Sequence, residues 1–150
     1  MLTKMDDCRA SFARRRLRRR VIRALALNKR REVRSDGLSL NHFENRLQIE
    51  WRAREVHPWD RDLPPARVAR LFAEQCLKDA DAALERLFAT LPQIDVIEFK
   101  MLDPNSGASI LSGTVTRSES MNVRAPSSGM RLKQLGVTYR LQNWRFEPLG

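Results

Sequence analysis

The clearest pattern along the chain is a helical repeat of apolar positions over residues 64–90. Apolar side chains recur there at steps of three and four, as on the buried face of an amphipathic helix, and Pro92 ends the run. Asp62 precedes Pro64 and Pro65, where a capping side chain and first-turn prolines suit a helix start. The spacing predicts a long helix buried through Val68, Leu71, Phe72, Cys76, Ala80, Ala83, Leu84, Leu87 and Phe88.

Three other segments alternate between apolar and polar residues, as half-buried strands do. The first runs from Leu47 to Ala53, and the others cover 94–102 and 110–116. Because the turn sequence DPNSG separates the last two, they are predicted to form a hairpin.

The C-terminal third predicts a surface loop over 117–129, then a short helix and a final strand over 137–141. Ser127 or Ser128 is placed to cap the helix, and Gly136 to end it. In the final strand, apolar residues occupy odd positions up to Leu141, and they then occupy even positions at Trp144 and Phe146. This shift in the alternation indicates a bulge or tight turn at Gln142–Asn143. The resulting β-α-β-β-α-β order predicts an α+β fold with a helix-backed antiparallel sheet.

A further helix is predicted from Ala10 to about Arg34, a stretch without Gly or Pro, with a stop near Asp36–Gly37. Its arginines repel each other at i,i+4 spacing, so we expect fraying until an anion or the rest of the protein binds it. The predicted division is a basic helical arm over 1–40 and a single α+β domain over 41–150. The narrow apolar stripe of the arm consists of Ala10, Ala13, Leu17, Val21 and Ala24.

Charge divides the chain in the same way. The protein has 28 Lys and Arg against 18 Asp and Glu, a net charge of +10. Residues 1–40 hold 13 basic and 4 acidic side chains (+9), which leaves 15 basic and 14 acidic (+1) for residues 41–150. A cationic segment of this density favours a polyanionic partner.

The basic run predicts a non-enzymatic, nucleic-acid-associated protein. Guanidinium groups neutralise phosphates without reading sequence, and if about five of them do so, the logarithmic salt slope of binding is roughly −4.5. The predicted phosphate-binding residues are Arg14, Arg15, Arg16, Arg18, Arg19, Arg20 and Arg23.

An alternative hypothesis treats the same helix as a protein-interaction module. Its apolar side, Leu17, Val21 and Leu25, would then dock on an acidic protein or an anionic membrane surface. No apolar run reaches the roughly 18 residues that a spanning segment needs. Two cysteines do not suggest a disulfide scaffold, so we expect reduced thiols in a cytoplasmic protein, with an Arg-rich organelle transit segment as the other possibility.

The polar side of the predicted sheet is a second candidate basic surface. Glu50 and Glu98 lower its net charge, and Trp51 alternates in phase with the core residues Leu47 and Ile49, so its ring is expected to face the core and not the polar side. We therefore expect an ordinary solvated sheet face there. Its basic members would be Arg46, Arg52, Arg54, Lys100 and Arg140.

Catalytic signals are weak. The tripeptide Glu98-Phe99-Lys100 resembles one element of metal-dependent nucleases, which makes a nuclease the third hypothesis. His42 and His57 lack the partners of a zinc site, and no glycine-rich phosphate-binding motif occurs. The sequence thus predicts no catalytic residue, no metal and no cofactor.

Overall fold

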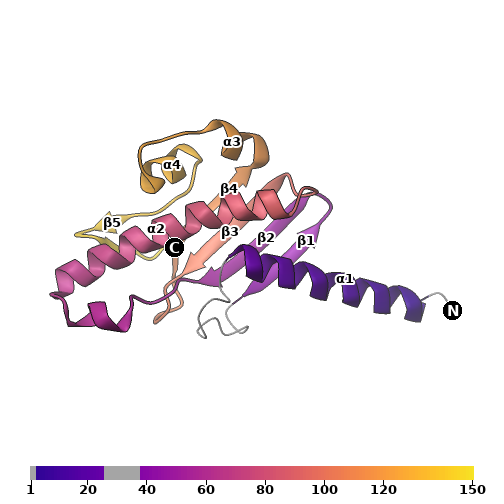
Figure 1. The fold of residues 1–150 in the computed structure, drawn as a ribbon, viewed down its shortest axis with the longest axis horizontal. Coiled ribbons are helices and arrows are strands. Elements are labelled where there is room, and N and C mark those ends of the chain that lie inside the picture. The colour runs from indigo at the N-terminus through magenta and orange to yellow at the C-terminus, as the bar shows by residue number, and fades with distance from the viewer. Residues whose placement is uncertain (1–2, 26–37) are drawn as a thin grey trace.

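A four-stranded mixed sheet, with strand order β1-β2-β3-β4, forms the centre of the protein (Figure 1). The computed structural model describes residues 3–25 and 38–150. The elements in chain order are α1 (Thr3–Ala24), β1 (Ser39–Phe43), β2 (Arg46–Arg52), the 3-10 helix η2 (Pro58–Asp62), α2 (Pro65–Thr90), β3 (Val96–Leu102), β4 (Ser109–Thr116), α3 (Arg117–Asn122), α4 (Ser128–Gln134), β5 (Leu141–Gln142) and β6 (Arg145–Phe146).

The sheet is mixed because two hairpins are joined side by side through α2. β1 and β2 are antiparallel, as are β3 and β4, whereas the central neighbours β2 and β3 are parallel. Parallel neighbours need a long crossover connection, and α2 supplies it. The α+β class is confirmed, and the prediction of an antiparallel sheet was wrong for the central pair.

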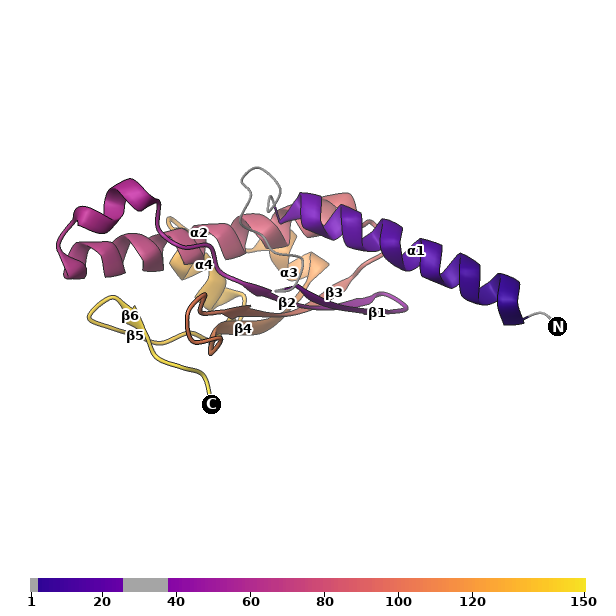
Figure 2. The same ribbon diagram turned by 90° about the horizontal axis from the view of Figure 1, so that it is seen from below.

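One face of the sheet forms the core. Buried side chains alternate along β2 and β3, and α1 and α2 lie side by side over this face (Figure 2). Trp51 of β2 stacks on Phe99 of β3 with 5.6 Å between ring centroids, which confirms Trp51 as a core residue. The core positions of the two strands are Leu47, Ile49, Trp51, Ile97, Phe99 and Met101.

The long predicted helix is confirmed as α2, but its predicted cap was wrong. Pro64 occupies the cap position and makes no side-chain capping bond. Asp62 instead ends η2, whose own cap is His57, with its Nδ1 accepting a hydrogen bond from the Trp59 amide at 3.2 Å. The prolines at the start of α2 have no amide hydrogen to cap, so the helix begins there without a capping side chain.

The N-terminal region differs from the prediction in two ways. Helix α1 begins at Thr3 rather than Ala10 and ends at Ala24, and the rest of the predicted helix and its stop near Asp36–Gly37 lie outside the described residues. The chain then forms β1, a strand that the apolar pattern did not predict because most of its side chains are exposed. The predicted boundary between residues 40 and 41 falls inside this strand.

The C-terminal third is more helical than predicted. Helix α4 is confirmed, with Ser127 accepting the Met130 amide at 3.2 Å and Gly136 at φ 84°. The predicted loop over 117–129 was wrong in part, since α3 occupies its first half. The predicted strand over 137–141 contributes one bridge, between Thr138 and Ser112, and β5 and β6 form a separate hairpin.

The turn of that hairpin is tight, as predicted, but lies one residue later than Gln142–Asn143. Asn143 and Trp144 both have positive φ, at 51° and 63°. Two successive positive φ values are typical of a two-residue hairpin turn.

Two arginines hold the α3–α4 layer against α2. Arg117 donates hydrogen bonds to the carbonyls of Phe88, Leu91 and Ile94, and so satisfies backbone acceptors at the end of α2. Arg131 is buried, pairs with Asp81 of α2 and also donates to the Ser120 carbonyl. Both guanidinium groups therefore stabilise the contact between α2 and the α3–α4 layer.

Replacing Arg131 by leucine should lower the free energy of unfolding by about 3–5 kcal/mol, because the largely buried Asp81 carboxylate would lose its partner. Urea denaturation measures this. The exposed Arg124 is the matched control, and Arg124→Leu should change stability by less than about 0.5 kcal/mol. Equal stabilities of the two variants would contradict a structural role for the Arg131 pair.

The two cysteines should differ sharply in reactivity. Cys8 is exposed, whereas Cys76 is buried in α2, and burial raises the pKa of its thiol. A thiol with a raised pKa stays protonated and inert at pH 8. Ellman's reagent should therefore titrate one thiol quickly in the native protein and two after denaturation. Rapid reaction of both thiols in the native protein would show that α2 opens readily.

Candidate functional site

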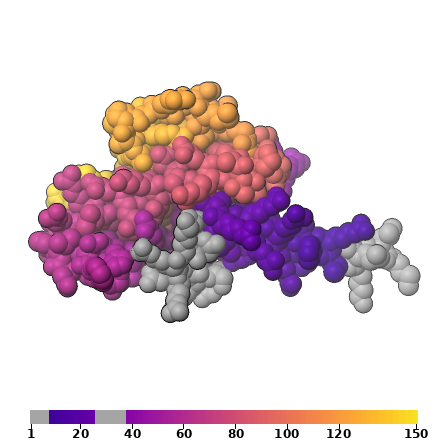
Figure 3. All heavy atoms as spheres, in the orientation of Figure 1, coloured from indigo at the N-terminus to yellow at the C-terminus, as the bar shows by residue number. Residues whose placement is uncertain are grey.

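Helix α1 is anchored at one end and projects at the other (Figures 1 and 3). Val21 is fully buried, and Ala24 and Leu25 beside it belong to the same core cluster, packed near α2. Toward the N-terminus the helix leaves residues 38–150, which we call the body, and its side chains from Cys8 to Arg16 are exposed. The last turns of α1 are thus part of the core, and the preceding turns present their side chains to solvent.

The geometry of an α-helix divides the arginines of α1 into two groups. At 3.6 residues per turn, the side opposite Val21 collects one aromatic ring and four arginines within about 100° of arc. Arg20 flanks this side, whereas Arg14 and Arg18 lie on the side that turns toward the body. We call the outward set the basic stripe: Phe12, Arg15, Arg16, Arg19 and Arg23.

Each predicted phosphate-binding arginine can now be placed. Arg14, Arg20 and the four arginines of the basic stripe are exposed. Arg18 is half-buried and donates to the Leu38 carbonyl at 3.3 Å, so it helps attach α1 to the start of β1. The seven arginines therefore form one exposed group of six and one residue engaged within the protein.

Ion pairs occur among the arginines of the body and not in the basic stripe. Among the side chains of residues 8–25 and 38–150, no arginine of the stripe forms an ion pair. Six of the twelve arginines of the body do: Arg46 with Glu98, Arg54 with Asp79, Arg61 with Glu55, Arg70 with Glu74, Arg117 with Asp95 and Arg131 with Asp81. The unpaired arginines of the stripe thus lie within nine residues of one helix, whereas those of the body are spread over positions 52–145.

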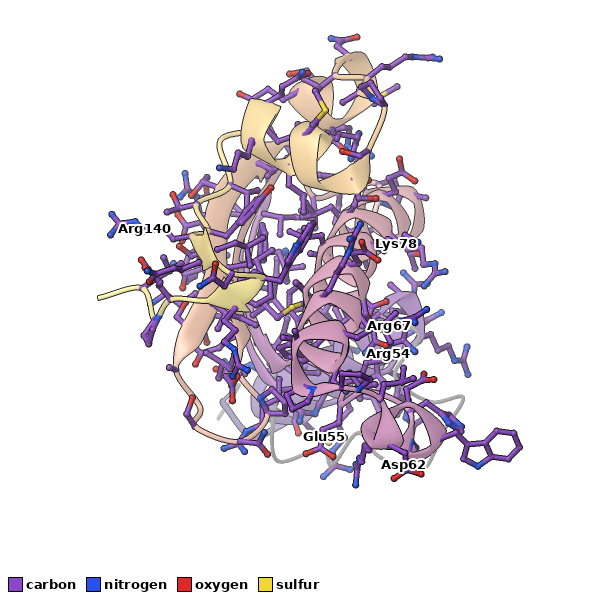
Figure 4. All side chains as sticks on the ribbon, turned by 90° about the vertical axis from the view of Figure 1, so that its left-hand side faces the viewer. Arg54, Glu55, Asp62, Arg67, Lys78 and Arg140 are labelled. Atoms are coloured by element: carbon purple, nitrogen blue, oxygen red, sulfur yellow. The ribbon has the colours of Figure 1, made fainter. Side chains whose placement is uncertain are left out.

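The second basic surface considered from the sequence does not form a cluster. Arg46 shares the Glu98 carboxylate with Gln48, and Arg54 lies beyond the end of β2 and pairs with Asp79 of α2 at 2.6 Å. That hydrogen bond raises the pKa of Arg54. Figure 4 shows Arg54 and Arg140 on opposite sides of the molecule. Among the described side chains, salt bridges thus occupy two of the five members, Arg46 and Arg54, and not Arg52, Lys100 or Arg140.

In the nuclease-like tripeptide Glu98-Phe99-Lys100, the glutamate is likewise occupied by a salt bridge. Glu98 accepts hydrogen bonds from Arg46 and from Gln48, the latter at 2.7 Å. The next carboxylate, Asp95, lies 3.7 Å from Arg117 and accepts from Asn45 at 3.3 Å. In the described part of the chain, no three His, Cys, Asp or Glu side chains gather as metal ligands would. The geometry therefore adds no support to the nuclease hypothesis.

Sequence reasoning missed one member of the basic stripe, Phe12. Its side chain is 72% exposed, and it borders two shallow hollows along α1. One hollow also touches Arg15, Arg16 and Arg19. The signal was available, because Phe12 precedes Arg15 and Arg16 by three and four residues and lies off the apolar stripe.

Comparison with known proteins does not assign the fold or a function. No family model, curated protein or solved structure matches the chain. Of the helices in residues 3–25 and 38–150, none has the length and apolar character that crossing a bilayer requires.

The anchoring of α1 can be tested by substitution. Val21→Ala should lower the free energy of unfolding by about 1–3 kcal/mol, because it empties part of the core. Arg16→Ala, five residues earlier on the same helix, should change it by less than about 0.5 kcal/mol. Thermal or urea unfolding gives both values. If Val21→Ala were as harmless as Arg16→Ala, α1 would not be part of the cooperative unit.

Proposed function

We propose that this protein binds nucleic acid without catalysing a reaction, through phosphate contacts made by the exposed arginines of α1. One observation carries the proposal: four guanidinium groups lie close together on one side of α1, and none of them has a carboxylate partner among the described side chains, whereas six of the twelve arginines of the body are paired. A dense set of unpaired cations on a projecting helix attracts a polyanion and releases its counterions.

The dimensions of the basic stripe suit several phosphates at once. Arg15 and Arg23 are eight residues apart, or roughly 12 Å along the helix axis. Guanidinium groups bind phosphate through paired N–H donors, and Arg15, Arg16, Arg19 and Arg23 direct theirs to one side. Arg20 extends the positive surface at one flank, and Arg14 is exposed on the other side of the helix. Such contacts position a backbone and carry no sequence information.

The alternative partner, an acidic protein or an anionic membrane, has lost its predicted docking face. Val21 and Leu25 are buried in the core and Leu17 packs against it, so this apolar side of α1 is already covered by the protein itself. A partner of either kind would have to bind the arginine side alone. Binding to anionic vesicles therefore distinguishes such a partner from nucleic acid.

Removing the charge of the stripe should weaken binding selectively. The variant Arg15→Gln/Arg16→Gln/Arg19→Gln/Arg23→Gln should lose most of its affinity for labelled DNA or RNA in fluorescence anisotropy. Its logarithmic salt slope should also become shallower, by roughly 0.9 for each lost contact to duplex phosphate. The stripe is exposed, so circular dichroism should show an intact fold.

A second quadruple variant controls for net charge. Arg67, Arg86, Arg124 and Arg140 are exposed on the body, and converting all four to glutamine removes the same charge. This variant should keep the wild-type salt slope. Equal losses in the two variants would mean that only net charge matters, and binding to anionic vesicles without binding to nucleic acid would overturn the proposal.

A further inference from the structure

Phe12 is the one large apolar side chain on the solvent-facing side of α1 that the structure describes. It lies in the middle of the arc that holds Arg15, Arg16, Arg19 and Arg23, one helical turn from Arg15 and Arg16. The apolar residues that anchor the helix are on the other side, so core packing does not account for this ring. Arg9, Arg15, Arg16 and Arg19 line the hollows beside it, together with Cys8 and Ala13.

An aromatic ring among cations matches the chemistry of single-stranded nucleic acid. Proteins that bind single strands combine a basic track for the backbone with aromatic rings on which bases stack. In a duplex, both faces of each base are already stacked, and opening a step costs a few kcal/mol. The ring of Phe12 therefore gains much more from an unpaired base than from a paired one.

An anionic membrane fits the same surface less well. Helices that lie on membranes bury a continuous apolar face of large side chains between the headgroups. On α1 the large apolar residues Leu17, Val21 and Leu25 pack in or against the core, and among the side chains of residues 8–25 only Phe12 is a large apolar group on the basic side. A polymer that carries both phosphates and flat rings satisfies every described member of the stripe.

Resting on the proposed function, we infer that Phe12 stacks on an unpaired base while the arginines beside it hold the flanking phosphates. Helix α1 is then a single-strand-binding element, with Phe12 as its selectivity residue. Duplexes are held by the arginines alone and bind more weakly at equal salt.

The test compares labelled oligo(dT) and oligo(U) with a duplex of the same length, using full-length protein. Phe12→Ala should weaken binding to the single strands by about 5–150-fold, the range for one stacked base, and change duplex binding less than about twofold. The salt slope should not change, because no phosphate contact is lost. Phe12→Trp keeps a stacking surface and should restore single-strand binding.

Trp59 provides the matched control. It is 85% exposed on η2, so Trp59→Ala removes an exposed aromatic ring from the body and should leave both affinities unchanged. An equal effect of Phe12→Ala on single strands and duplex, or no effect on either, would overturn the inference. A loss confined to binding of anionic phosphatidylglycerol vesicles would overturn it in favour of a membrane contact.

The inference and the proposed function fail in different ways. If the arginine variant loses nucleic-acid binding and Phe12→Ala does not, the arm binds phosphates and only the stacking role of Phe12 is wrong. If wild-type protein binds neither single strands nor duplex at low salt, the proposed function itself is wrong.

Discussion

The packing of α2 on the parallel strands β2 and β3 is the interaction on which the rest of the structure depends. One side of α2 covers the buried residues of the two strands, and its flanks receive α1, α3 and α4. Because α2 is also the crossover between those strands, the same residues that bury the sheet determine its topology. Without this helix, the sheet would have no core, and α1 would have no surface to pack on.

Arginine has two distinct roles in this protein. Arg117 and Arg131 bind carbonyls and carboxylates of the body, where a planar group with several donors can reach several acceptors at once. Arg117 donates to carbonyls at and just after the end of α2, and Arg131 donates to the Ser120 and Val123 carbonyls and pairs with Asp81. The arginines of the basic stripe have no such partners among the described residues. The distinction is one of position, since arginine is the prevalent basic residue throughout the chain: only five of the 28 basic residues are lysines.

The sequence predicted elements with strong periodicity and missed those whose signals are not periodic. α2 and the cores of β2, β3 and β4 follow from their spacing, and Ser127 and Gly136 identify α4. β1 was not predicted because four of its five residues are exposed and show no apolar alternation. α3 was not predicted because its six residues are too few to show a helical repeat. The parallel pairing of β2 and β3 is a tertiary property that alternation alone does not report. The arginines of α1 follow from composition alone, whereas a single aromatic residue such as Phe12 has no periodic signal of its own.

The continuity of α1 has a thermodynamic consequence. The same unbroken helix carries crowded guanidinium groups outside and the Val21 anchor inside, so mutual repulsion among the former opposes the order that the latter maintains. A polyanion that neutralises the outer turns of α1 also favours the helical state of the inner turns packed in the core. Its binding adds RT ln(1 + [L]/Kd) to the free energy of unfolding. The melting temperature of the core should therefore rise with the fraction of protein whose exposed α1 turns are bound by a polyanion.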